Sequence, residues 1–288
     1  MNWWAWVVEP LQYDFMKRAA IATVAVCVAS PMCGVWALSR RLVYFTDAMS
    51  HGILAGIAGA AIVGGSLLLG GLLAAVTMAL FVSFLIVRAR APEDGAIGVV
   101  GQGLFALGVM GISLQREPRA LTHILFGNPL TVSATDVVVN TTLSAVVVVS
   151  ILTMQPVLLA TTFNPAHART VGIRVGLVDA TLMVTLSLTV VAALATVGAL
   201  MAITLIIAPA VIARMLGRSL HHMIAISVGC GLVSGIAGLL ISYHAGLPTG
   251  PTVALVAVAQ VGLAAAWVRP AGAMRRTLVH DRNEQAWL

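Results

Sequence analysis

Long apolar runs, broken by short segments that contain the charged residues, make up nearly the whole chain. Several runs approach or exceed the roughly 20 residues that an α-helix needs to cross the hydrocarbon core of a membrane. A transmembrane β-barrel would instead show alternating residues in segments of about ten. The pattern predicts an all-α polytopic membrane protein with eight to nine transmembrane helices; the candidate spans are 16–38, 43–64, 66–87, 94–114, 135–159, 177–199, 201–216, 220–243 and 250–268.

Composition supports this class. Of the 288 residues, 60% are hydrophobic and 9% are charged, and the mean hydropathy is +1.01, which a domain with a fully solvated surface would not reach. No soluble segment is long enough to fold alone, so we expect one transmembrane domain over 1–288. The net charge of +6 is spread among short loops rather than gathered in a patch, which excludes a nucleic-acid partner.

The arginines also predict orientation, because loops rich in Lys and Arg tend to stay in the cytoplasm. With nine spans, the carboxyl terminus and most arginine-bearing loops share the cytoplasmic side, and the amino terminus lies outside. The cytoplasmic arginines would be Arg40, Arg41, Arg88, Arg90, Arg169, Arg174, Arg214, Arg218, Arg269, Arg275 and Arg276.

Small residues are dense in two of the spans, at 52–65 and at 229–238. Small side chains let helices approach closely in lipid, where packing drives association. We therefore expect both segments in the bundle interior or at a contact between subunits. The more polar segment 114–130 is expected to form an external loop with a short helix.

Two polar side chains interrupt the second span. Asp47 and His51 are four residues apart, so on a helix they share one face and can converge on one point. A carboxylate costs several kcal/mol near a bilayer centre and usually marks an ion path. Two simpler interpretations are that Asp47 caps a helix near the interface, and that His51 is a core histidine with its hydrogen bonds satisfied.

Carboxylate oxygen and imidazole nitrogen together suit manganese, zinc or iron(II), and the pair accepts all three. Two ligands make an incomplete site, whereas two chains around a shared pore would offer two Asp and two His, the number that a tetrahedral site needs. Met49, between them, is expected to pack rather than bind. The ligands must be deprotonated, so protonation of His51 should weaken uptake.

The segment 161–176 joins the fifth and sixth spans. Asn164 followed by Pro165 favours a helix start, and Gly172 is available to end the helix. Arg169 and Arg174 place it in the cytoplasm. It is either an ordinary interfacial connector or a docking helix for a cytoplasmic partner.

A partner is needed if ATP provides the energy. The phosphate-binding loop requires a lysine, and the only lysine, Lys17, lies in FMKRAA. This chain cannot supply that loop, so ATP would bind another polypeptide.

Four stretches in matching order resemble the membrane permease of bacterial manganese, zinc and iron ABC importers. They are RRLVYFTDAMSHGILAGIAGA, LFGNPL, FNPAHARTVGI and VDATLMVTLSLTVVAALATVGALMAITLIIAPAVIARML. The resemblance covers about residues 15–268. Met49 stands where that family has leucine, Ala55 where proline is usual, and Asn164-Pro165-Ala166 where Asp-Pro-Glu is more usual.

The resemblance implies a permease dimer in the bacterial plasma membrane, two cytoplasmic ATPase subunits, and an extracellular or periplasmic metal-binding protein. It identifies Asp47 and His51 as pore ligands of the transported ion, and it implies no permanently bound cofactor. A mid-helix proline, Pro209, would allow a kink. The coupling helix at 163–173 would dock the ATPase through Asn164, Pro165, Ala168, Arg169 and Gly172.

Two alternatives stay open. A secondary transporter or channel for divalent metal would need no ATPase, although such proteins often show half-repeats that are not found here. An ABC permease for metal chelates should have a wide pore without a ligand pair for a bare ion. An enzyme is the weakest interpretation, because the remaining histidines lack an evident nucleophile or carboxylate beside them.

Overall fold

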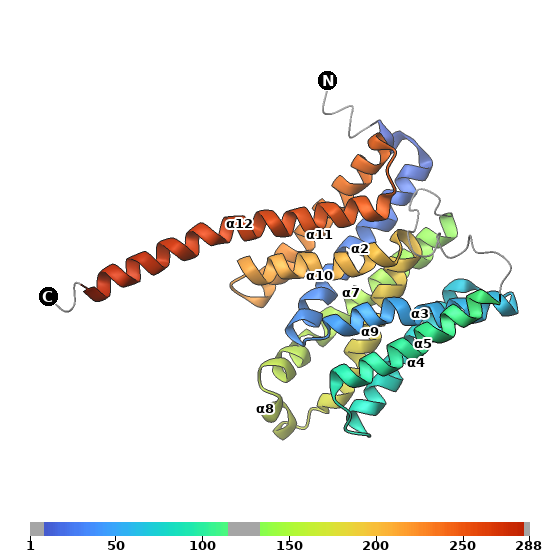
Figure 1. Ribbon diagram of the computed structural model, residues 1–288, viewed down its shortest axis with the longest axis horizontal. Coiled ribbons are helices and arrows are strands. Elements are labelled where there is room, and N and C mark those ends of the chain that lie inside the picture. Colours follow the sequence, from blue (N-terminus) through green and yellow to red (C-terminus); the bar gives the residue numbers. More distant parts are fainter. Residues whose placement is uncertain (1–8, 115–132, 285–288) are drawn as a thin grey trace.

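The computed structural model describes residues 9–114 and 133–284, and these are helical almost throughout, with no strand among them (Figure 1). The all-α prediction is confirmed. Most of the predicted external loop at 114–130 lies outside the described residues. The elements are η1 (Pro10–Gln12), α2 (Asp14–Ser39), α3 (Val43–Val63), α4 (Leu67–Val87), α5 (Glu93–Ser113), α7 (Ala134–Phe163), α8 (Pro165–Thr170), α9 (Val175–Val197), α10 (Ala199–Leu216), α11 (Leu220–Ala245) and α12 (Thr249–Glu284).

Polar residues between the apolar runs set several helix starts. Ser66 and Ser219 accept hydrogen bonds from backbone N–H groups of the first turns of α4 and α11. At the start of α7, Ser133 and Asp136 form a reciprocal capping box. Each cap satisfies N–H groups that have no partner inside the helix.

Eight of the described helices are long and apolar enough to cross a membrane. The ninth candidate, α10, is apolar but shorter; its 18 residues would extend about 27 Å, close to the thickness of a hydrocarbon core. One residue, Gly198, connects it to α9 with a φ of 83°. The helix continues through Pro209. The prediction of eight to nine spans therefore fits the structure.

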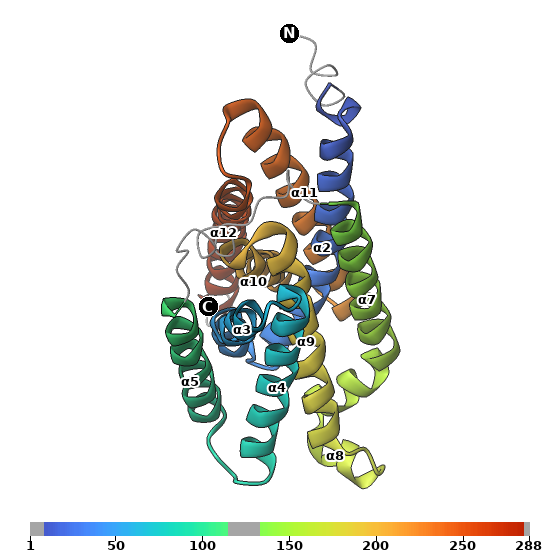
Figure 2. The same ribbon diagram turned by 90° about the vertical axis from the view of Figure 1, so that its right-hand side faces the viewer.

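Helix α2 is the most buried candidate span, and it contacts α7, α9, α10 and α11. Helices α3, α4 and α5 form a second group. This group contacts α9 through α3 and α4. In Figure 2, α8 and the α4–α5 connection lie at the same end of the bundle, opposite the start of α2. This is the end that the arginine pattern assigns to the cytoplasm.

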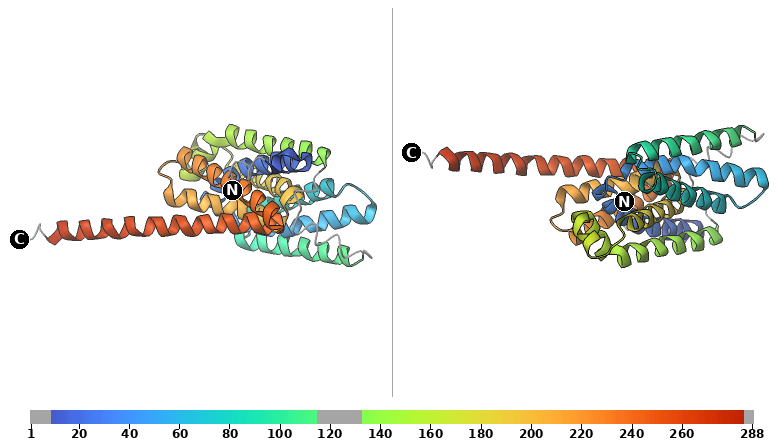
Figure 3. Two further views of the ribbon diagram at one scale, coloured as in Figure 1. Left: turned by 90° about the horizontal axis from the view of Figure 1, so that it is seen from above. Right: turned by 90° about the horizontal axis from the view of Figure 1, so that it is seen from below.

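The last span was expected to end at 268, but α12 continues to Glu284 and extends beyond the bundle (Figure 3). The added residues include Ala, Met, Leu and Arg, which favour helix even outside a packed core. The apolar run therefore predicted where the candidate span ends, but it did not predict where the helix ends.

Both small-residue segments pack inside the chain. A Cβ at Gly56 would overlap the carbonyl oxygen of Gly70, so α3 and α4 touch through their backbones. On α11, Gly231 and Gly235 face the backbone and side chain of Cys27. The segments therefore serve the bundle interior, one of the two places expected for them.

We predict that Gly34→Ala destabilises the protein, because a Cβ there would overlap the carbonyl oxygen of Ile206 on α10. Forcing α2 and α10 apart should cost about 1–3 kcal/mol. The matched control is Gly229→Ala, where a Cβ would meet nothing within 4 Å and should be neutral or stabilising. Thermal unfolding in detergent measures both; equal unfolding temperatures would contradict the close approach.

Candidate metal pathway and coupling elements

Asp47 lies inside α3, not at its start. The helix begins at Val43 with Leu42 as its N-cap, so Asp47 is in the second turn. The capping interpretation of Asp47 is therefore wrong. Asp47 and His51 are one helical turn apart, as their spacing predicts, and both side chains are half-buried.

The two residues belong to a partly exposed stripe on α3, in which Ala58 is buried. Tyr44 and Ile62, at helical spacing from them, are 43% and 56% exposed, and Ala55 is half-buried. Met49 points into the core and is fully buried, as expected of a packing residue. The partly exposed stripe shows that Asp47 and His51 lie on the face of α3 that this chain leaves incompletely covered.

His51 contacts α5. Its ring lies edge-on to Phe105, with ring centroids 5.5 Å apart and planes at 71°. His51 makes no hydrogen bond within the described part of the chain, and it is only half-buried. These features do not fit a core histidine with satisfied hydrogen bonds.

Helix α5 runs alongside α3 over its whole length. A Cβ at Gly98 would lie 3.3 Å from the hydroxyl of Tyr44, and one at Gly101 would lie 2.9 Å from the Cβ of Ala48. Near the other end, a Cβ at Gly108 would meet the backbone of Leu54 at 2.9 Å. The contacts advance in the same direction on both helices, so α3 and α5 are parallel neighbours.

Within residues 9–114 and 133–268, no group of three or more His, Cys, Asp or Glu side chains converges on one point. Asp47 and His51 would fill two coordination positions of a metal ion.

The connector between α7 and α9 contains the helix expected there. Asn164 Oδ1 accepts a hydrogen bond from His167 N at 3.0 Å, and Pro165 occupies the first helical position. Ala168 is 1% exposed and anchors the helix against the bundle. Gly172, with a φ of 86°, turns the chain out of it, a conformation that glycine adopts without strain.

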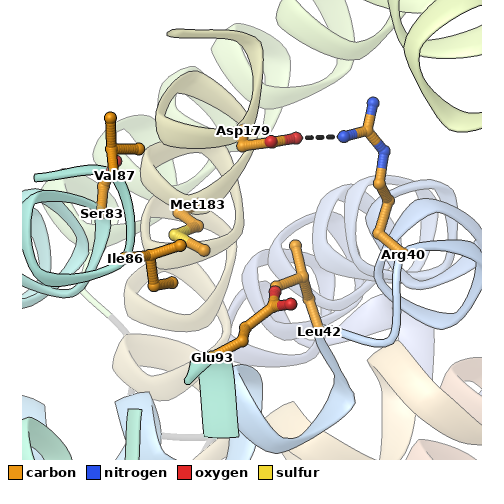
Figure 4. A pocket seen from close by; sticks show the side chains of 8 residues that line it. All are labelled: Arg40, Leu42, Ser83, Ile86, Val87, Glu93, Asp179 and Met183. Atoms are coloured by element: carbon orange, nitrogen blue, oxygen red, sulfur yellow. Dashed lines mark hydrogen bonds and ion pairs between the residues drawn. The ribbon is translucent and has the colours of Figure 1, made fainter. Parts of the chain in front are cut away.

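Sequence reasoning missed an ion pair at the same end of the bundle. Arg40, at the end of α2, pairs with Asp179 on α9, and the two point toward one another in Figure 4. The Arg40 guanidinium also donates to the Thr162 hydroxyl at 2.7 Å and to the Thr161 hydroxyl, both on α7. Only 11% of the Arg40 side chain is exposed. One sequence signal was Asp179, an acidic residue inside the candidate span 177–199.

The ion pair borders a pocket of about 160 Å³ to which α4, α5, α9 and the connection between α2 and α3 contribute. Glu93, at the start of α5, lines the same pocket. Charged residues thus gather at the corner between α2 and α3. The residues that line the pocket are Arg40, Leu42, Ser83, Ile86, Val87, Glu93, Asp179 and Met183.

Known membrane proteins of metal transport systems are similar to this chain. The manganese transport system membrane protein MntC of Listeria monocytogenes is 33% identical over 86% of this chain and 88% of its own length. The chelated iron transport system membrane protein YfeD of Yersinia pestis is 32% identical over 86% of this chain and 84% of its own. Among solved structures, PsaBC from Streptococcus pneumoniae in complex with Fab matches with a TM-score of 0.80 and 28% identity, over 90% of this chain and 94% of that one.

A family model covers nearly the whole described bundle. Residues 12–268 match the model of the ABC 3 transport family, a range that includes α2 to α11 and the apolar part of α12. It contains Asp47, His51, the short helix α8 and the Arg40–Asp179 pair. This multi-pass membrane protein therefore belongs to the ABC 3 transport family.

Proposed function

We propose that the chain is the membrane permease subunit of an ATP-driven ABC importer for a divalent transition metal ion: manganese, zinc or iron. The family match supports this class, as do its relatives, a manganese transport system membrane protein and a chelated iron transport system membrane protein. The observation that carries the metal assignment is the position of Asp47 and His51 on the open face of α3.

A carboxylate facing lipid from the second turn of an apolar helix would be costly. A second permease chain against this face would remove that cost and bring together two carboxylates and two imidazoles. Four such ligands can take the place of the water molecules around a divalent cation. An isolated pair of ligands would replace fewer of them. The proposed pore therefore lies between two permease chains, identical or paralogous.

Transport would proceed by alternating access. ATP binding and hydrolysis in two cytoplasmic ATPase subunits would move α8, and the two permease halves would rock around the bound ion. The Arg40 contacts to α7 and α9, the helices that flank α8, provide a path for that motion to the start of α3. An extracellular or periplasmic metal-binding protein would deliver the ion to the permease in the bacterial plasma membrane.

Two rival functions differ in what they require. A secondary transporter or channel would move metal without an ATPase, so copurification of an ATPase subunit argues against it. A permease for metal chelates would not depend on Asp47 or His51 as ligands of a bare ion.

We predict that Asp47→Ala and His51→Ala each reduce metal uptake to background in reconstituted vesicles, because each removes ligands from the pore. The assembled complex should remain, since both side chains are only half-buried. Asp94→Ala and His222→Ala are matched controls, because both side chains are exposed. Wild-type uptake of manganese, zinc and iron by either pore variant would retire the site.

We predict that Gly172→Ala and Arg169→Ala lower the amount of metal transported per ATP hydrolysed. The first forces a side chain into a left-handed backbone conformation, and the second removes a basic side chain from the last turn of α8. Arg174→Ala, on the far side of Gly172, is the control for loss of basic charge. Parallel measurement of uptake and ATP hydrolysis tests this; an unchanged ratio in both variants would count against α8 as the coupling helix.

We predict the same loss of coupling for Arg40→Gln, because Asp179, Thr161 and Thr162 lose their common partner. Arg41→Gln makes the same chemical change at the next residue, whose side chain is exposed, and should retain wild-type coupling. The ratio of metal transported to ATP hydrolysed is again the measurement. Equal ratios in the two variants would show that the Arg40 contacts do not transmit the motion.

A further inference from the structure

Gln102 is a polar side chain near the middle of α5, a helix otherwise almost free of polar groups between Asp94 and Ser113. Its side chain is exposed and makes no hydrogen bond within the described part of the chain. A primary amide left without partners in hydrocarbon costs several kcal/mol. Its exposure therefore indicates a neighbour that this single chain does not provide.

The register between α5 and α3 places Gln102 beside the proposed pore ligands. Gln102 follows Gly98 by four residues and precedes Phe105 by three, so the three share one side of α5. Gly98 lies against Tyr44, and Phe105 lies against His51. Gln102 therefore lies between two positions that touch the stripe of α3 containing Asp47 and His51.

Gln102 also lies at the same depth along the bundle as the proposed pore ligands. Gly101, the residue before Gln102, contacts Ala48, the residue after Asp47. Gln102 is thus at the level of the Asp47–His51 turn, and it is exposed on the face that a second chain would cover. A Cβ at the neighbouring Gly103 would meet nothing within 4 Å, so there is open space beside this part of α5.

We propose that the amide oxygen of Gln102 is a further ligand of the transported ion and favours manganese over zinc. This inference rests on the proposed function. Two chains would then supply two carboxylates, two imidazoles and two amide oxygens, a six-membered set rich in hard oxygen. Manganese suits such a set, whereas zinc prefers four ligands with nitrogen or sulfur among them.

The test compares Mn²⁺ and Zn²⁺ uptake, each metal supplied as its chloride, by the reconstituted complex with Gln102→Leu and Gln102→Glu. Leucine has a similar volume without the oxygen, and we expect Mn²⁺ affinity to fall about tenfold or more, as even outer-shell changes at metal sites do. Zn²⁺ uptake should fall less, so the Mn²⁺/Zn²⁺ ratio drops. Glutamate keeps an oxygen at the same position and should restore Mn²⁺ uptake.

Gln155→Leu is the control, because Gln155 is a half-buried amide on α7 that pairs with His221. It should leave the ratio unchanged. A wild-type ratio in Gln102→Leu, or an equal loss of both metals that glutamate does not restore, would overturn the assignment. If Gln102→Leu does not assemble, Gln102→Asn, which shortens the amide by one methylene, provides the same comparison.

The outcomes separate this inference from the proposed function. If the wild-type complex takes up no divalent metal, the proposed function fails and the ligand assignment fails with it. If the wild type takes up metal through Asp47 and His51 while Gln102→Leu keeps the wild-type ratio, only the role of Gln102 is withdrawn.

Discussion

The cost of keeping polar groups away from water organises this protein. A carboxylate, an imidazole and an amide occupy neighbouring faces of α3 and α5, two helices that otherwise consist of apolar and small residues. Within one chain these groups remain partly exposed. Their placement is favourable only if a second chain, water and a passing cation occupy the space in front of them. The proposed metal site therefore depends on the proposed dimer, and the two stand or fall together.

Close backbone contact makes that arrangement rigid. Glycines on α3, α4 and α5 bring these helices together without intervening side chains, so α3 is held from two sides while its third side stays open. In lipid, such contacts replace the hydrophobic driving force that packs a soluble core. The same device joins α2 to α10 and α11. A rigid three-helix unit suits a mechanism in which whole halves rock around an ion.

Charge is concentrated where that unit meets the connector α8. Arg40 ends α2 just before α3 begins, and it holds α7 and α9 through two threonine hydroxyls and one carboxylate. Few residues therefore separate the proposed docking helix from the proposed ligands. The pocket beside the ion pair is lined by residues of α4, α5 and α9 and of the connection between α2 and α3.

The sequence alone determined the helical class, the approximate spans, the Asp47–His51 face and the capped helix at Pro165–Thr170. Each of these depends on local physics: hydrophobic length, helical spacing and capping chemistry. The Arg40–Asp179 pair and the alignment of Gln102 with His51 required the tertiary structure, because residues 139 and 51 positions apart meet only through helix packing. The partly exposed stripe on α3 was likewise invisible in the sequence, since exposure depends on which neighbours cover a helix.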